Sequence, residues 1–168
     1  FKLKDSKAIG RMENEGLWLR KLNKYGIGPR VYFYGENFLV GSFVNGYKIL
    51  DYFDKCSLVE KKKVVKEVFR QCKILDELHV DKFEMHNPYK HVLIKPTGKA
   101  VMIDFERCRY SIKPKNVTGF AQFLLRIGFK VNKERLRSLL KKYKKSYGEE
   151  DYLEIVNTFI SLLLKFSN

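Results

Sequence analysis

The sequence predicts an α+β fold made of two small lobes, for two reasons. Short β-rich runs alternate with helices in the first part of the chain, whereas the segments after Pro114 have the apolar spacing of helices. Such segregation of strands from helices is typical of α+β folds. The polar pair Asn45-Gly46 is the candidate hinge, so we expect a first lobe over residues 1–44 and a mostly helical second lobe over residues 45–168.

Residues 1–44 are expected to form a strand, a helix and a hairpin. Phe1–Lys4 alternates apolar and basic residues like the end of a strand. Apolar residues at helical spacing predict a helix over Met12–Tyr25, and Gly26–Pro29 ends it because glycine caps a helix and proline cannot continue it. Two β-rich runs follow, Val31–Tyr34 and Phe38–Val44, and the short polar turn between them predicts a hairpin.

The middle of the chain begins with the clearest helix. Ser57 and Glu60 have the spacing of a capping box, and the apolar pattern after them predicts a helix that ends near His79. An irregular segment follows, and then two short strands, His91–Ile94 and Ala100–Asp104, joined by a turn. The tail predicts three helices, over Asn116–Ile127, Asn132–Ser146 and Glu149–Phe166.

The composition predicts a cytoplasmic protein with one well-packed core. The chain has 168 residues, of which 45% are hydrophobic, and no run approaches the roughly 18 apolar residues of a membrane span. No signal peptide is visible, and because residue 1 is Phe we expect a fragment of a longer chain. The 3 cysteines are odd in number and lack Cys-x-x-Cys spacing, which indicates a reduced compartment and argues against zinc.

The net charge of +15 is concentrated in one segment. Between Arg107 and Lys145 there are 13 Lys and Arg residues against the single acid Glu134, whereas the rest of the chain holds 21 basic and 18 acidic residues. A concentrated basic surface is typical of proteins that bind an anionic partner, such as nucleic acid, a nucleotide or an acidic protein. A solvated helix face explains the pattern equally well.

An acidic side chain interrupts the second predicted hairpin. Val101–Ile103 is apolar and predicts a buried strand, yet Asp104 follows where the chain is still expected to be inside the protein. A buried carboxylate is costly unless a cation or hydrogen-bond donors meet it. Either Asp104 serves a bound cation, or its carboxylate caps the turn that follows.

The segment Gly98–Cys108 and its place in the chain resemble the protein-kinase-like superfamily. The Asp-Phe-Glu motif at 104–106 follows a predicted β-hairpin, a loop with two histidines (His86 and His91) and a long helix. In this order the chain is similar to the atypical prokaryotic branch that includes predicted archaeal serine/threonine kinases. Around the motif it is also similar to bacterial kinases of lipopolysaccharide sugars. The resemblance implies a bilobal fold with a truncated N-terminal lobe and a small, mostly helical C-terminal lobe.

The resemblance also implies ATP and Mg²⁺ as cofactors. In this superfamily the aspartate of the motif holds Mg²⁺ against the nucleotide phosphates, which makes Asp104 the expected metal ligand. Val44 lies where the hinge would meet the adenine. Glu15 is expected to pair with the phosphate-binding lysine, and Glu13 is the alternative. An acid in the first turn of a helix is also explained without any site, because the helix dipole favours negative charge there.

The lysine that would complete this pair is expected near or before the start of the sequence. Lys2 is the candidate, and Lys4 lies on the same face of the predicted strand. Their spacing to Glu15 is short for the superfamily, so a lysine before Phe1 is the third candidate. The glycine-rich phosphate loop of the superfamily is absent from the sequence, so either it precedes residue 1 or the domain never had one.

The predicted catalytic loop departs from the superfamily at two positions. Alignment of the strand after the loop places His91 at the metal-binding asparagine and His86 at the aspartate that accepts the hydroxyl proton. A histidine can be a general base near neutral pH, and Glu84 is a second candidate for that role. Imidazole is a softer ligand than Mg²⁺ prefers. Hydrogen bonds that orient the loop explain both histidines equally well.

The resemblance implies an ATP-dependent serine/threonine protein kinase acting on a protein substrate. The alternative is a kinase-fold pseudoenzyme that binds RNA, the ribosome or a protein without catalysis. The basic segment Arg107–Lys145 is the expected surface for RNA or another anionic partner, whereas no membrane partner is expected. A kinase of a small anionic molecule is a further alternative.

Overall fold

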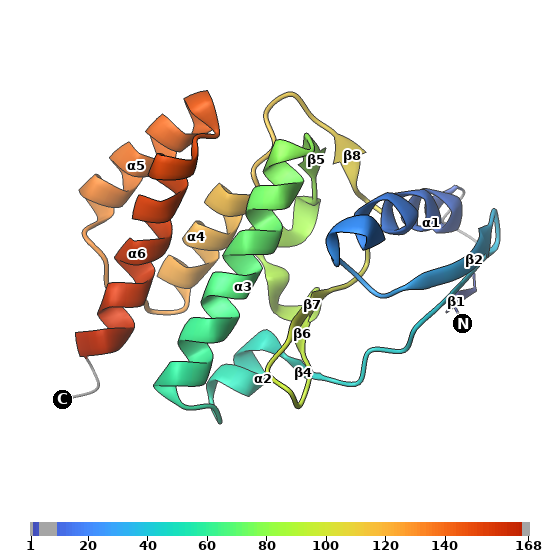
Figure 1. The fold of residues 1–168 in the computed structure, drawn as a ribbon, viewed down its shortest axis with the longest axis horizontal. Coiled ribbons are helices and arrows are strands. Elements are labelled where there is room, and N and C mark those ends of the chain that lie inside the picture. Colours follow the sequence, from blue (N-terminus) through green and yellow to red (C-terminus); the bar gives the residue numbers. More distant parts are fainter. Residues whose placement is uncertain (1, 4–9, 166–168) are drawn as a thin grey trace.

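A computed structural model describes residues 2–3 and 10–165 of the chain (Figure 1). It contains helices and small antiparallel sheets, the mixture that the sequence predicts for an α+β fold. The α-helices are α1 (Arg11–Leu22), α2 (Ile49–Phe53), α3 (Leu58–Glu77), α4 (Asn116–Arg126), α5 (Lys133–Ser146) and α6 (Glu149–Lys165). None of the described helices combines the length and the hydrophobicity that crossing a bilayer requires.

The strands form three small sheets. They are β1 (Lys2–Leu3), β2 (Val31–Gly35), β3 (Phe38–Gly41), β4 (Tyr47–Lys48), β5 (Val80–Asp81), β6 (Val92–Ile94), β7 (Ala100–Met102) and β8 (Arg109–Tyr110). The first sheet has the order β1-β3-β2, the second has the order β4-β6-β7, and β5 pairs with β8. All these pairs are antiparallel, so both predicted hairpins, β2-β3 and β6-β7, are confirmed.

Helix α1 packs against the first sheet (Figure 1). Met12, Leu19 and Leu22 are buried on one side of the helix, as the apolar spacing predicts. Gly16 permits the close approach to β2, because a Cβ at this position would lie 2.5 Å from Cβ of Tyr34. The helix therefore presents one side of its first turns to the interior, and this side includes Glu15.

Helix α3 runs through the middle of the molecule, between the β6-β7 hairpin and the helical tail (Figure 1). The predicted capping box is confirmed, since the Ser57 Oγ accepts from the Glu60 N–H at 3.2 Å and the Glu60 carboxylate accepts from the Ser57 N–H at 2.8 Å. The ring centroid of Phe69 lies 4.8 Å from the ring centroid of Phe120 in α4 and 5.7 Å from that of Phe159 in α6. These contacts join the tail to the core.

Several predicted boundaries were wrong by one to three residues, and most of the shortest elements were missed. The strand predicted to end at Val44 ends at Gly41, and the strand predicted to end at Asp104 ends at Met102. The predicted irregular segment contains β5 and two 3-10 helices, Phe83–His86 and Pro88–Lys90. Of the two-residue strands only β1 was predicted, within Phe1–Lys4; β4, β5 and β8 carry too little periodicity, and pairing with another strand alone defines them.

Candidate functional site

Asp104 lies in the loop that leaves the β6-β7 hairpin, two residues after β7 ends. Its backbone has a φ of 64°, a left-handed conformation that few residues other than glycine adopt. Such a conformation costs about 1–3 kcal/mol and is concentrated at functional sites. Asp104 is half-buried rather than enclosed, so its carboxylate faces a region that a ligand can reach.

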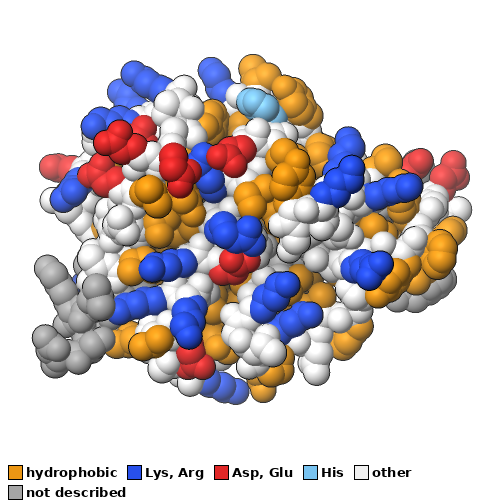
Figure 2. Space-filling view, in the orientation of Figure 1, with side chains coloured by type: hydrophobic (Ala, Val, Ile, Leu, Met, Phe, Trp, Pro, Cys, Tyr) orange, Lys and Arg blue, Asp and Glu red, His pale blue; other side chains and the backbone are white. Residues whose placement is uncertain are grey.

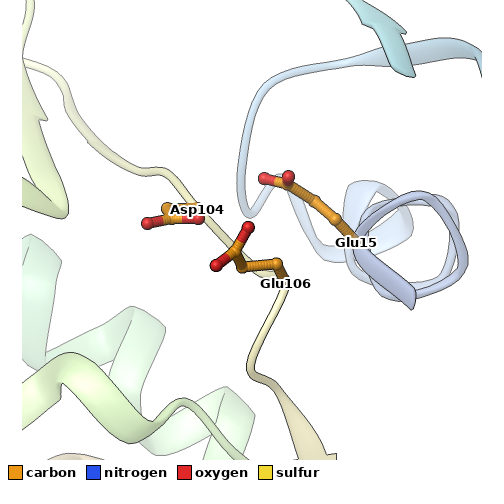
Figure 3. Close-up of side chains that lie close together, drawn as sticks. All are labelled: Glu15, Asp104 and Glu106. Carbon is orange, nitrogen blue, oxygen red and sulfur yellow. The ribbon is translucent and has the colours of Figure 1, made fainter. Parts of the chain in front are cut away.

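Three carboxylates converge beside this loop (Figure 3). Glu15 extends from α1, while Asp104 and Glu106 come from the loop after β7, and one oxygen from each lies within 4.8 Å of the other two. The structure thus brings together side chains that are some 90 residues apart in the chain. It also distinguishes the two glutamates of α1, because Glu15 is buried and Glu13 is exposed.

Hydrogen bonds fix α1 against the loop that carries the motif. Oε1 of Glu15 accepts a hydrogen bond of 3.1 Å from the backbone N–H of Phe105. Nδ2 of Asn14 donates to the backbone oxygens of Glu106 at 2.8 Å and Cys108 at 3.1 Å. One helix therefore positions the backbone on both sides of Glu106, and the side chain of Phe105 is fully buried beneath.

A cleft of about 540 Å³ opens next to Asp104. A volume of this size is ordinary for a small-molecule site. Its lining comes from α1, from the turn before β2, from β3 and the segment after it, from β6, and from the segments that precede β6 and follow β7. The lining residues are Glu15, Pro29, Leu39, Gly41, Ser42, Phe43, Val44, Lys90, His91, Leu93, Ile103 and Asp104. Four of the predicted site residues, Glu15, Val44, His91 and Asp104, thus share one cleft.

His91 stands against the expected metal ligand. Its Nδ1 lies 3.3 Å from Oδ2 of Asp104, a distance compatible with an ion pair when the imidazole is protonated. The same Nδ1 is buried and forms no hydrogen bond in the described part of the chain. The structure therefore places His91 beside the carboxylate of Asp104, and the role of His91 as a metal ligand stays a prediction.

A buried lysine that the sequence reasoning missed connects Glu84 to the motif. The side chain of Lys82 is 0% exposed, and its Nζ donates to the backbone oxygen of Asp104 at 2.6 Å. The same Nζ lies 3.3 Å from Oε2 of Glu84, whose Oε1 is buried and has no hydrogen-bond partner among the described residues. No periodicity marks Lys82, because it lies in an irregular segment and only its buried contacts reveal it.

His86, the other candidate base, lies elsewhere. Its ring Nδ1 is 2.9 Å from the backbone oxygen of Phe83, and its own backbone oxygen accepts a hydrogen bond from Arg126 of α4. It lines a separate pocket that includes Asp81, Arg109 and Lys115, and it does not line the cleft beside Asp104. These contacts join His86 to Phe83 in its own loop and to α4.

The predicted lysines are only partly described. The backbone of Lys2 belongs to β1 and pairs with Leu39, a residue that lines the cleft. The side chain of Lys2 and the whole of Lys4 lie outside the described residues. The pairing of either lysine with Glu15 therefore stays a prediction.

The cysteines form neither a nucleophile nor a metal site at the cleft. Burial raises the pKa of the Cys108 thiol to about 12, and burial also raises that of Cys72 well above its ordinary value. Cys56 is half-buried, and burial raises its pKa as well. Thiols with raised pKa values are protonated at neutral pH and behave as small apolar groups.

No protein-family model matches the sequence, and no curated protein matches it either. The function is therefore inferred from the residues of the cleft and their geometry.

Proposed function

We propose that the chain is a kinase-like protein that binds Mg²⁺-ATP in the cleft beside Asp104 and transfers the γ-phosphoryl group to a protein hydroxyl. In this proposal the fold is bilobal, with the β1-β3-β2 sheet and α1 in a truncated first lobe. The observation that carries it is the convergence of Glu15, Asp104 and Glu106 beside a cleft that also contains Val44.

The donor set fits Mg²⁺. This ion prefers oxygen ligands and is held in nucleotide sites by one or two carboxylates together with phosphates and water. Two oxygens bound to one Mg²⁺ lie roughly 3–4 Å apart, given metal–oxygen distances of about 2.1 Å. The carboxylate oxygens lie within 4.8 Å of one another, so small side-chain rotations would bring two of them to one ion. Asp104 is the proposed ligand, with Glu106 in support.

The rest of the cleft has groups for the nucleotide. Val44 and Phe43 supply apolar surface, and Phe43 is 89% exposed, which leaves it accessible to cover a base. Lys90 also lines the cleft and carries a charge that complements phosphate. Bound Mg²⁺ would offset the phosphate charge during transfer, and the residues of the cleft would hold the nucleotide in position.

Glu84 is the better candidate for the general base. One carboxylate oxygen of Glu84 has no hydrogen-bond partner among the described residues, and Lys82 contacts both this carboxylate and the backbone oxygen of Asp104. Oε1 of Glu84 is buried and Glu84 does not line the cleft, so in this proposal the segment Phe83–His86 shifts to bring this oxygen to the substrate hydroxyl. The hydroxyl then loses its proton to Glu84 as the phosphoryl group is transferred. His86 faces a different pocket and is not proposed in this role.

We expect Glu84→Gln to lower phosphoryl transfer by about 100-fold or more, since general bases contribute about 10²–10⁴-fold. The amide keeps the size of the side chain but cannot accept the proton. The measurement is transfer of radiolabel from [γ-³²P]ATP to the chain itself and to casein, with the dissociation constant of ATP measured in parallel. His86→Ala is the matched control and should change transfer by no more than about twofold. If His86→Ala abolishes transfer and Glu84→Gln does not, the base is wrongly assigned.

A nucleotide-binding pseudoenzyme is the second candidate. The observation that favours it is that neither Glu84 nor His86 lines the cleft. This candidate predicts Mg²⁺-dependent ATP binding with no radiolabel transfer in the same assay.

A further inference from the structure

A second concave surface lies between α4 and α5. It is a groove of about 700 Å³ that shares no lining residue with the cleft beside Asp104. Six of its lining residues are basic and none is acidic. The cations are Lys113, Lys133, Arg137, Lys141, Lys144 and Lys145. We call this surface the basic groove.

The cations of the basic groove are exposed and form no ion pair with any side chain in the described part of the chain. Other cations of the chain form ion pairs: Nη2 of Arg135 lies 3.0 Å from Oε1 of Glu154, and Nζ of Lys73 lies 2.6 Å from Oε1 of Glu77. On the face shown in Figure 2, basic side chains are likewise interspersed with acidic and apolar ones. Like charges along one helix face destabilise it, so an anionic ligand would stabilise this surface.

The uncharged lining of the basic groove, which we call its floor, is mostly aliphatic: it has three leucines beside Thr118 and Gln122 of α4. Leu136 is buried, while Leu125 of α4 and Leu140 of α5 are half-buried and reach the groove. The groove-lining cations of α5 recur every three or four residues along the helix, beside Leu136 and Leu140. The row from Lys133 to Lys144 is about 17 Å long at 1.5 Å per residue. The groove thus offers a narrow apolar strip with positive charge along its edge.

A surface that combines aliphatic residues with cations fits some classes of anionic partner better than others. Single-stranded nucleic acid is bound by stacking of bases on aromatic side chains as well as by charge, and no lining residue of the basic groove is aromatic. Phosphates also gain nothing from a floor of leucines. An amphipathic helix with apolar residues on one side and acidic residues beside them matches both features.

We propose that the basic groove binds an acidic, amphipathic helical segment of a partner protein. The apolar side of that segment packs on Leu125 and Leu140, and its carboxylates pair with the lysines of α5. This binding is independent of nucleotide binding in the cleft, so failure of either proposal leaves the other unchanged.

The test uses a fluorescein-labelled synthetic helix of about 15 residues, with leucine at spacings of three and four and glutamate between. A scrambled peptide of the same composition and a single-stranded oligouridylate are the comparison probes. Fluorescence anisotropy at about 0.15 M salt gives the dissociation constants. We expect the amphipathic peptide to bind at least about fivefold more tightly than the scrambled one, because only it presents a continuous apolar side.

Charge reversal locates the binding. We expect Lys141→Glu with Lys144→Glu to weaken binding of the amphipathic peptide by about tenfold or more. Lys63→Glu with Lys66→Glu on α3 makes the same change in net charge at exposed positions and should leave the dissociation constant within about twofold. A Lys141→Gln, Lys144→Gln variant, which only neutralises the charges, should give an intermediate loss.

Three results would overturn the proposal. The first is that the amphipathic peptide does not bind at all. The second is equal affinity for the scrambled peptide, which would show that charge alone attracts the ligand. The third is loss of oligouridylate binding, but not of peptide binding, in the α5 variant, which would make the groove an RNA site.

Discussion

Asp104→Asn is expected to weaken Mg²⁺-dependent ATP binding by about 100-fold or more. Loss of a residue that merely supports a metal ligand costs about 10–100-fold in metal affinity, so loss of a ligand itself should reach or exceed that range. A 100-fold change in the dissociation constant corresponds to about 2.7 kcal/mol. The amide keeps the shape of the side chain but removes the charge that Mg²⁺ requires. Isothermal titration of both chains with ATP in excess Mg²⁺ measures the change.

Two controls make this result specific. Asp54→Asn changes an exposed aspartate in the turn after α2 and should leave ATP binding unchanged. Thermal unfolding of the Asp104→Asn chain without nucleotide should occur close to the wild-type temperature, because the carboxylate of Asp104 is half-exposed. Wild-type affinity for Mg²⁺-ATP in the Asp104→Asn variant would show that Asp104 does not hold the metal.

Asp76→Ala is expected to lower the free energy of unfolding by about 3–5 kcal/mol, because it leaves several buried donors without an acceptor. Asp76 lies in α3 and is 1% exposed. Its carboxylate accepts hydrogen bonds from the backbone N–H groups of Asn116 (2.9 Å) and Val117 (3.2 Å), from the Asn116 side chain (2.7 Å) and from the Tyr143 hydroxyl (2.9 Å).

This carboxylate caps α4 from a different helix. The residue at the N-cap position, Lys115, provides no side-chain cap, so Asp76 satisfies N–H groups at the start of the helix. Burial raises the pKa of Asp76, and the four donors act against that rise. Burial and the adjacent carboxyl of Asp76 raise the pKa of Tyr143, which keeps its hydroxyl protonated as a donor. The network joins α3, α4 and α5 around one acceptor.

Urea unfolding followed by circular dichroism measures the effect of Asp76→Ala. Domains of this size have total stabilities of about 5–15 kcal/mol, so the expected loss is a large fraction of the whole. Asp76→Asn should lose less, because its amide oxygen still accepts, and Asp54→Ala should lie within about 0.5 kcal/mol of the wild type. A loss below about 1 kcal/mol for Asp76→Ala would contradict the account of this network.

The long helices could be predicted because their signals are local. The Ser57–Glu60 capping box and the apolar stripe of α3 fix both the start and the buried side of that helix. The first helix was predicted to run to Tyr25, but α1 ends at Leu22 and Asn23–Tyr25 form a 3-10 helix, so the glycines and proline mark the end of this 3-10 helix rather than of α1. The strands were harder to predict: β4, β5 and β8 have two residues each, and only pairing across the fold defines them.

The candidate site was predicted in part, because some of its residues stand out in the sequence pattern whereas the residues that contact them do not. Asp104 was singled out by a charge after an apolar run, and Glu15 by its place on the inner side of a helix. Lys82 and Glu106 were not assigned roles, since an isolated charge in an irregular segment predicts a solvated side chain. Only the folded chain shows that Lys82 is buried and donates to the backbone of Asp104.

The most direct test of the central claim, that the carboxylates beside the cleft hold the metal of a bound nucleotide, is an NMR titration with paramagnetic Mn²⁺. A nonhydrolysable ATP analogue is added to the isotopically labelled chain, and Mn²⁺ then replaces Mg²⁺. The account predicts that amide signals of Glu15, Asp104 and Glu106 broaden first, while those of the basic groove persist. Uniform broadening, or broadening centred on another part of the molecule, would contradict it.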